Sequence, residues 1–295
     1  MRVGVGLTNG AYTPEAYAYK EYLEGKGVSV ELALRRDLHA TNDINILFMG
    51  MSPFWSSRSC KKEIHEYQSL SIPPLAKTKD FFKWAVNCKP AGRIFLNQTV
   101  KEDLGFGEAV PSITRDMGVD KAFYEIERNA SPSYDLVYSG SIKGRVGLVD
   151  EICRLGLLGL KILVIGETDD ETSVRFKKLS HITLTGRVER QDLPALYRLA
   201  RAGLNYTPDI YPFNIQTSTK TLEYCAAGIG LVSNQYKWAE DFCEEKDVSP
   251  LWVQHIKSRD DFDSYQFHKI DMPEYLWENI LDRSGLLSFL EAVAG

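Results

Sequence analysis

Short apolar runs alternate with helical patterns along nearly the whole chain, and this alternation restricts the possible folds more than any other feature. Thr13-Pro14 is typical of a helix start, and it opens a helical stretch that ends at Gly25 or Gly27. Strands that alternate with helices form βαβ units and mostly parallel sheets. The sequence therefore predicts an α/β protein, with first-half strands at 2–7, 28–34, 44–50 and 92–97.

The same alternation restarts after a polar stretch that contains Pro132. Amphipathic helices are expected at 147–159 and 191–203, and the second has Leu193, Leu196, Tyr197 and Ala200 on one face. Strands are expected at 136–140, 161–166, 181–186 and 229–234. We therefore predict two α/β domains, formed by residues 1–130 and 131–272.

Composition argues against several classes of protein. The net charge of −5 over 295 residues argues against a general nucleic-acid binder. The five cysteines show no paired spacing, which favours a reducing cytosol over a disulfide framework. No run approaches the roughly 20 apolar residues of a membrane span, and no signal peptide is expected before the first strand.

The stretch "TSTKTLEYCAAG" predicts a helix that begins near Ser218 or Thr219. The first N–H groups of a helix lack internal partners and attract anions. Lys220 in the first turn opposes the helix dipole, which is unfavourable unless an anion is bound there. Glu223 lies on the same face and suits ribose hydroxyls, so the stretch suggests a nucleoside diphosphate pocket. A plain capping box, or an exposed Lys220–Glu223 pair, explains the same residues.

Residues 211–234, "YPFNIQTSTKTLEYCAAGIGLVSN", resemble the C-terminal signature of retaining GT-B glycosyltransferases of family 4. Three earlier segments also resemble that family in the expected order: "YDLVYSGSIKGR", "KILVIGE" and "ITLTGRVERQDLPALYRLARAGLNYTP". The resemblance covers residues 134–235. It implies a GT-B fold, with two Rossmann-like domains whose parallel sheets face each other across a cleft. A C-terminal helix, residues 273–295, would then pack back on the N-terminal domain, anchored by Trp277.

The resemblance also implies roles for particular residues. Arg145, or less favourably Lys143, and Lys220 would grip the diphosphate and act in catalysis. The residues implied for the nucleotide and its diphosphate are Gly140, Ser141, Arg145, Gly186, Arg187, Val188, Ser218, Thr219, Lys220 and Glu223. Those implied for the donor sugar are Asn214, Ile215, Gln216 and Thr217. Ile215 departs from the family pattern E-x7-E, whose first acid it replaces, and Asp209 is a more distant substitute.

The first half carries weaker signals. "GVGLTNG" is a poor Rossmann fingerprint, because its third glycine is misplaced. Thr8, Asn9 and Gly10 would form an acceptor-side loop in a GT-B protein, and a tight βα turn explains them equally well. His65 resembles a histidine that follows a strand and faces the donor sugar as a catalytic residue. A surface or capping histidine is the alternative.

Residues 75–89 predict a basic amphipathic helix, with Phe81, Trp84 and Cys88 on one face. Such a helix can lie on an anionic membrane surface, and a core helix with solvated lysines is the alternative. Residues 58–93 hold eight basic and three acidic side chains, which agrees with a basic patch.

Taken with the resemblance, these observations imply a retaining, metal-independent hexosyltransferase. It would use a UDP or GDP sugar, need no cofactor, and modify a glycan or a lipid-linked acceptor in bacterial cell-surface polysaccharide biosynthesis. We expect a cytoplasmic protein, either free or peripheral at the inner face of the membrane. A non-catalytic GT-B-like partner of a glycosyltransferase, or a nucleotide-sugar epimerase of the same fold, is the alternative.

Overall fold

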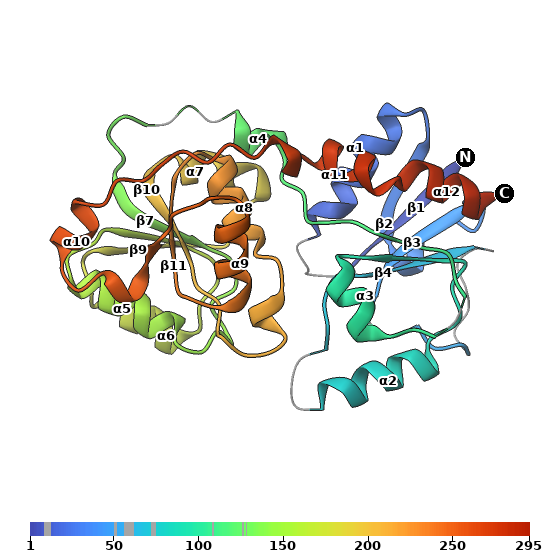
Figure 1. Ribbon diagram of the computed structural model, residues 1–295, viewed down its shortest axis with the longest axis horizontal. Coiled ribbons are helices and arrows are strands. Elements are labelled where there is room, and N and C mark those ends of the chain that lie inside the picture. The colour runs from blue at the N-terminus through green and yellow to red at the C-terminus, as the bar shows by residue number, and fades with distance from the viewer. Residues whose placement is uncertain are drawn as a thin grey trace. The chain divides into compact units, whose positions relative to one another are not determined.

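The computed structural model describes residues 1–8, 13–49, 52–55, 62–71, 75–107, 109–125, 127 and 129–295, apart from the side chain of Ala76. The chain divides into two compact units (Figure 1). Unit 1 comprises residues 1–118 and 274–295, and unit 2 comprises residues 119–273.

The first boundary between the two units lies after residue 118, whereas the sequence analysis expected the domain boundary after residue 130. The short helix α4 (Lys121–Tyr124) follows that point. Asp120, just before α4, forms an ion pair with Arg190 of unit 2. Phe123 is buried and packs against Tyr197, with ring centres 5.4 Å apart. These contacts attach residues 119–125 to unit 2.

Unit 1 is built on a six-stranded parallel sheet in the order β2-β1-β3-β4-β5-β6. Its strands are β1 (Arg2–Leu7), β2 (Ser29–Leu34), β3 (Ile44–Phe48), β4 (Glu63–Tyr67), β5 (Gly92–Phe95) and β6 (Ser112–Thr114). Its helices are α1 (Pro14–Gly25), α2 (Ala76–Val86), α3 (Gln98–Leu104), α11 (Trp277–Ser284) and α12 (Leu286–Ala294). The four strands expected in this half are present, and β4 and β6 are additional.

The C-terminal residues pack on the N-terminal part of unit 1. Tyr22 of α1 donates a hydrogen bond to Asp282 of α11 over 2.6 Å. Trp277, the expected anchor, is buried and lies against Gly118, where an added Cβ would come within 2.4 Å of the indole ring. Arg115 lies over the same ring, 5.3 Å from its centre.

Unit 2 contains a second six-stranded parallel sheet in the order β12-β11-β10-β7-β8-β9. The strands are β7 (Tyr134–Ser139), β8 (Ile162–Ile165), β9 (Ile182–Gly186), β10 (Ala200–Asn205), β11 (Gly230–Ser233) and β12 (Leu251–Trp252). The main helices are α5 (Leu148–Leu157), α6 (Asp170–Lys177), α7 (Leu193–Tyr197), α8 (Thr219–Ala226), α9 (Lys237–Glu245) and α10 (Arg259–Asp263). In Figure 1, α5 and α6 cover one face of this sheet, and α8 and α9 cover the other.

The helix expected at 191–203 was wrong in its second half. The α7 helix ends at Tyr197, and β10 begins at Ala200. Ala200, Ala202 and Leu204 are buried in the sheet, where β10 pairs with β7. The burial of a central strand therefore overrides the helical spacing of these residues.

The strand order reverses next to β7, the first strand of unit 2. The chain moves from β7 to β8 and β9 in one direction, and from β10 to β11 and β12 in the other. In parallel α/β sheets, ligands bind at such a switch point, outside the carboxyl ends of the strands. A ligand site is therefore expected at the loops after β7 and β10.

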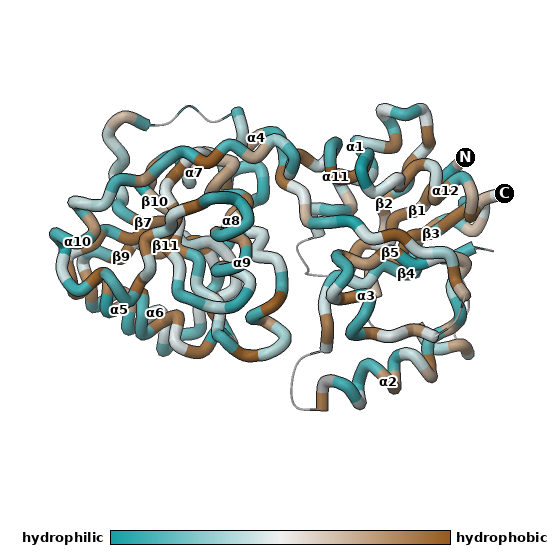
Figure 2. Tube along the Cα trace, viewed as in Figure 1, coloured by the Kyte–Doolittle hydropathy of each residue, from teal (hydrophilic) through white to brown (hydrophobic). Residues whose placement is uncertain are grey.

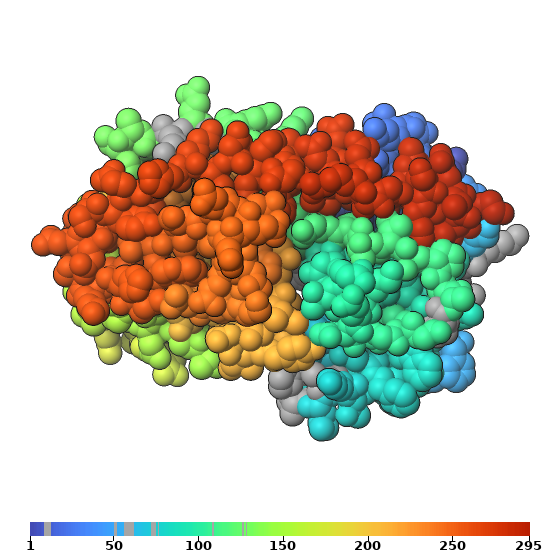
Figure 3. All heavy atoms as spheres, viewed as in Figure 1, coloured from blue at the N-terminus to red at the C-terminus, as the bar shows by residue number. Residues whose placement is uncertain are grey.

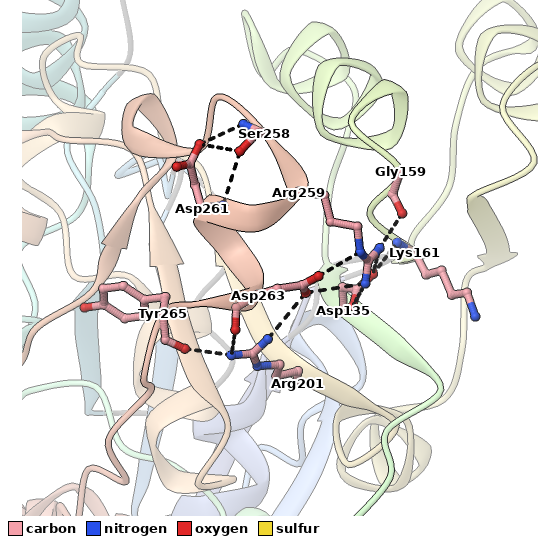
Figure 4. A network of polar contacts seen from close by, with 9 residues as sticks. All are labelled: Asp135, Gly159, Lys161, Arg201, Ser258, Arg259, Asp261, Asp263 and Tyr265. Carbon is pink, nitrogen blue, oxygen red and sulfur yellow. Dashed lines mark hydrogen bonds and ion pairs between the residues drawn. The ribbon is translucent and has the colours of Figure 1, made fainter.

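The opposite, amino-terminal end of this sheet holds a polar network (Figure 4). Arg259 of α10 donates two hydrogen bonds to Asp135 of β7, over 3.0 and 3.1 Å. Arg201 of β10 donates to the backbone oxygen of Tyr265 over 2.6 Å. Ser258 and Asp261 form a capping box at the start of α10. This network fixes α10 to the sheet at the end away from the switch point.

Candidate functional site

The helix α8 begins beside the carboxyl end of β10 and is held there by its N-cap, Ser218. The Ser218 hydroxyl accepts the N–H of Thr221 over 3.3 Å and donates to Asn205 Oδ1 over 2.9 Å. Asn205 is the last residue of β10, and its amide donates to Ser233 at the end of β11. Among the described residues, the backbone N–H groups of Thr219 and Lys220 have no acceptor. The start of α8 is thus fixed in place with free donors.

A glycine turn follows β7 and lies directly beneath Lys220. Gly140 has φ +114°, and its N–H donates to the Ile165 oxygen over 2.9 Å. A Cβ at Gly140 would lie 3.0 Å from Lys220 Cε and 3.4 Å from Nζ. A Cβ at Gly166 would lie 2.3 Å from the Gly140 oxygen. The turn therefore requires glycine, and it brings the backbone close to the Lys220 ammonium.

Lys220 and Arg145 bring two positive charges to this turn. Burial, together with the nearby Arg145 guanidinium, lowers the pKa of Lys220 to about 7, and the charge of Glu223 opposes this shift. The Lys220 ammonium lies 5.6 Å from the centre of the Tyr138 ring. Within the described part of the chain, neither cation forms an ion pair. Two like charges close together without a counterion favour an anionic ligand.

Glu223 is buried behind Lys220 in a hydrogen-bond network. The Tyr197 hydroxyl donates to Glu223 Oε2 over 2.9 Å and lies 2.5 Å from Ser139 Oγ. Burial raises the Glu223 pKa to about 7, opposed by the Tyr197 hydrogen bond and by the charges of Lys220 and Arg190. The network orients this carboxylate at the carboxyl end of β7, close to the free cations.

The expected sugar-binding loop carries polar atoms without partners. Asn214 donates to Asp209 Oδ1 over 2.9 Å, which brings the more distant substitute for the missing acid into this loop. Asn214 Oδ1 and Gln216 Nε2 of this loop, and Thr221 Oγ1 in the first turn of α8, are buried and have no hydrogen-bond partner among the described residues. Ile215 and Thr217 are half-buried between them. Buried polar atoms rarely stay unpaired, so this loop is suited to a polyhydroxylated ligand.

The remaining residues predicted for the nucleotide lie on the neighbouring loops. Ser141 is exposed and donates to the Lys143 oxygen over 3.3 Å. Gly186 ends β9, and its oxygen accepts the N–H of Gly166 over 3.0 Å, which ties this loop to the glycine turn. Arg187 is exposed and Val188 is half-buried.

Sequence reasoning missed several residues that position this site. Tyr197 was assigned only to an apolar helix face, yet its hydroxyl holds Glu223. Asn205 was not singled out, although it holds Ser218. An asparagine that ends a buried strand was the available signal, because a polar residue there needs a partner.

The structure contradicts the placement of His65. The sequence analysis expected it in a loop after a strand, but it lies in the middle of β4 and is fully buried. It lies close to Glu63 and Cys88. Of the expected acceptor-side loop, Thr8 is exposed directly after β1, while Asn9 and Gly10 lie outside the described residues.

The helix α2 presents aromatic residues at the surface of unit 1. Phe81 is 64% exposed and Trp84 is 41% exposed, which rules out the core-helix alternative for these residues. Hydrophobic and hydrophilic residues alternate along α2 in Figure 2, and its atoms stand at the surface in Figure 3. Cys88 lies beyond the end of α2 and is buried. None of the helices in the described ranges is both long and apolar enough to cross a membrane.

Several solved structures resemble the chain over nearly its full length. AviGT4, a glycosyltransferase involved in avilamycin A biosynthesis, is 12% identical with a TM-score of 0.63, and the match covers 100% of this chain and 98% of AviGT4. Sucrose-phosphate synthase from Thermosynechococcus elongatus is 13% identical with a TM-score of 0.60, covering 99% and 96%. Anabaena HepE, solved with UDP and glucose, is 11% identical with a TM-score of 0.59, covering 100% and 98%.

A scan against protein-family models and a search of curated protein sequences found no match. The structural matches establish that the chain has the GT-B fold, which confirms the fold class expected from the sequence.

Proposed function

We propose that this protein is a glycosyltransferase that binds a nucleoside diphosphate sugar at the start of α8. The observation that carries the proposal is that Lys220 and Arg145, neither of which forms an ion pair among the described residues, lie near each other beside the glycine turn at the switch point. The fold it shares with HepE, which was solved with UDP and glucose, supports the same function.

The proposed chemistry rests on where negative charge grows. When the bond between the sugar and the diphosphate breaks, the leaving diphosphate gains negative charge. Lys220, Arg145 and the free N–H groups of α8 would stabilise that charge, and preorganised donors of this kind are a large catalytic term. We propose that these groups do the work that a divalent metal does elsewhere, so that transfer needs no metal.

The donor sugar would lie against the loop of Asn214 and Gln216, whose unpaired polar atoms would bind its hydroxyls. Glu223 would hold the ribose. We further propose retention of configuration, a hexose as the transferred group, and a cell-surface glycan as the product. The support for these finer points is the sequence resemblance.

Calorimetry with UDP and GDP tests the donor site. Charge-assisted hydrogen bonds contribute about 1.5–3 kcal/mol, so Lys220→Ala and Arg145→Ala should each weaken the binding of the preferred nucleotide by roughly 10- to 150-fold. Lys178→Ala removes an exposed lysine of the same unit and is the matched control, which should bind normally. Equal affinities for all four proteins would refute the diphosphate site.

Transfer itself needs a separate assay. Incubation with UDP- or GDP-hexoses and glycan acceptors, followed by NMR of the new anomeric centre, would report both transfer and its stereochemistry. Turnover in a chelator, measured while the fold is monitored by circular dichroism, would report metal dependence. Tight nucleotide binding without transfer to any acceptor would instead favour the non-catalytic partner, which Ile215 in place of an acid also supports.

We also propose that the protein is cytoplasmic and that α2 docks it on an anionic membrane surface. Leu75, Phe81, Phe82 and Trp84 are exposed, and Lys77 and Lys79 lie on the same short helix. Exposed aromatic side chains beside lysines are typical of interfacial helices. Co-sedimentation with anionic liposomes should exceed that with zwitterionic liposomes, and Lys77→Glu with Lys79→Glu should abolish the difference. Unchanged binding by the double variant would remove this part of the proposal.

A further inference from the structure

Three side chains able to bind a metal ion meet in the interior of unit 1. Glu63 and His65 are two residues apart on β4, so both project from the same face of the sheet. Cys88 follows α2 and reaches the same point. All three are buried, with exposed fractions of 4%, 0% and 7%.

The ligand atoms form a nearly equilateral triangle. Cys88 Sγ lies 3.8 Å from His65 Nε2 and 3.7 Å from Glu63 Oε2. His65 Nε2 and Glu63 Oε2 are 3.8 Å apart. In the plane of the three atoms, the point equidistant from them lies about 2.2 Å from each, which falls between the typical Zn–N distance of about 2.0–2.1 Å and the typical Zn–S distance of about 2.3 Å.

The arrangement does not suit a nucleophile–histidine–acid relay. In such a relay one imidazole nitrogen faces the nucleophile and the other faces the acid. Here Cys88 and Glu63 both approach Nε2. His65 Nδ1 has no partner among the described residues. Since a single nitrogen offers one lone pair or one proton, three atoms arranged around one point fit a shared ion better.

Surrounding residues hold Cys88 in this position. Its N–H donates to the Ser52 oxygen over 2.8 Å, and the Ser52 N–H donates to Asn87 Oδ1 over 2.6 Å. Ser52 Oγ accepts from Arg35 and lies 3.5 Å from Cys88 Sγ, where its proton can stabilise a thiolate. Metal ligands are commonly held by such outer hydrogen bonds.

Charge and chemistry agree with a divalent ion. A Cys88 thiolate and a Glu63 carboxylate together carry two negative charges, which a divalent ion would neutralise in this buried position. A set of one sulfur, one nitrogen and one oxygen suits zinc better than magnesium or calcium, which prefer oxygen ligands.

We propose that Glu63, His65 and Cys88 bind a structural Zn²⁺ that connects β4 to the segment after α2. The Ser52 hydroxyl or a water molecule would be the fourth ligand of a four-coordinate site. Binding would release the Cys88 thiol proton to solvent. The site shares no residue with the proposed donor site, so either proposal can fail alone.

The test is the metal content of the full-length protein, purified without a histidine tag from medium supplied with zinc. Elemental analysis should find one zinc per chain. Cys88→Ser and His65→Gln should lose it, while Cys153→Ser, a control that changes a partly buried cysteine of unit 2, should keep it. Less than one zinc in ten wild-type chains, or full zinc in Cys88→Ser, would overturn the proposal.

Cobalt substitution keeps the test valid where a variant folds poorly. The protein unfolded, stripped of zinc and refolded with Co²⁺ should show a thiolate-to-cobalt charge-transfer band. Glu63→Gln, which preserves size, should keep the band but release the ion more readily to a chelator. Absence of the band from refolded wild-type protein, shown to be folded by its near-ultraviolet circular dichroism, would also overturn the site. UDP binding measured on the same samples separates this outcome from failure of the donor site.

Discussion

The Lys220 ammonium is the group through which pH should control nucleotide binding. Burial and the Arg145 charge lower its pKa to about 7. A diphosphate above the Gly140 turn would pair with the ammonium and raise that pKa toward its ordinary value of about 10.4. Because the lowered pKa means that the free protein loses this charge as pH rises through 7, binding above pH 7 must take up a proton.

The size of the effect follows from the two pKa values. With a pKa of about 7, Lys220 is half protonated at pH 7, about one-eleventh at pH 8 and about one-hundredth at pH 9. If the bound form stays protonated, the dissociation constant for UDP should rise about fivefold from pH 7 to 8 and about fiftyfold from pH 7 to 9. A terminal phosphate ionises near pH 6, so the charge of UDP changes little in this range.

Glu223 titrates in the same pH range, so its effect on UDP binding must be separated from that of Lys220. Burial raises its pKa to about 7, so its carboxylate forms as pH rises and repels the diphosphate. That carboxylate also favours the Lys220 ammonium, which reduces the proton uptake. Replacing Lys220 with residues that cannot titrate isolates its contribution.

Titration calorimetry of UDP at pH 8, in buffers with different ionisation enthalpies, measures the proton uptake directly. Wild-type protein should take up about 0.9 proton per nucleotide if Glu223 contributes little. Lys220→Ala should take up much less, and Lys220→Arg should bind with little pH dependence, since arginine stays charged. Wild-type affinity that is constant from pH 7 to 9, or equal uptake by Lys220→Ala, would refute this account of the site.

Three further predictions concern the scaffold around the site. Gly140→Ala should lower stability by about 1–3 kcal/mol in urea unfolding and weaken UDP binding, because φ +114° strains alanine and its Cβ meets Lys220; a variant as stable as wild type would contradict the turn geometry. Ser218→Ala should lower the free energy of unfolding in urea by about 1 kcal/mol, because the cap of α8 is lost. An unchanged urea midpoint would contradict this role of Ser218. Arg259→Ala should cost about 1–3 kcal/mol through loss of its hydrogen bonds to Asp135, with UDP affinity in calorimetry unaltered; a large affinity loss would link the two ends of the sheet.

The strands that the sequence missed show where pattern reasoning reaches its limit. The β4 segment "EIHEY" contains two glutamates and a histidine, yet all five residues are buried. Its polar side chains are accommodated by distant residues: Glu66 pairs with Arg115, and Glu63 lies by Cys88. Because those partners are 49 and 25 residues away, no local window could distinguish this strand from a polar loop.

The proximity of Gly140 to Lys220 in the proposed donor site was easier to anticipate, and the sheet topology explains why. Gly140 and Lys220 are 80 positions apart in the sequence, but β7 and β10 are neighbours and parallel, so the loop after β7 and the loop before α8 open at the same edge. Local patterns identified each loop separately, and the alternation of strands and helices placed both at carboxyl ends.

The orientation of the side chains could not be anticipated in the same way. Whether Lys220 turns toward Gly140 or toward solvent depends on Ser218 being held by Asn205, and on Tyr197 holding Glu223 behind it. The first of these contacts links the end of β10 to the cap of α8, and the second links α7 to α8. The capping-box and diphosphate interpretations of the same sequence therefore differ only in three-dimensional contacts. The contacts satisfy the cap through Ser218 and leave the Lys220 charge without an ion pair among the described residues, which favours the diphosphate interpretation.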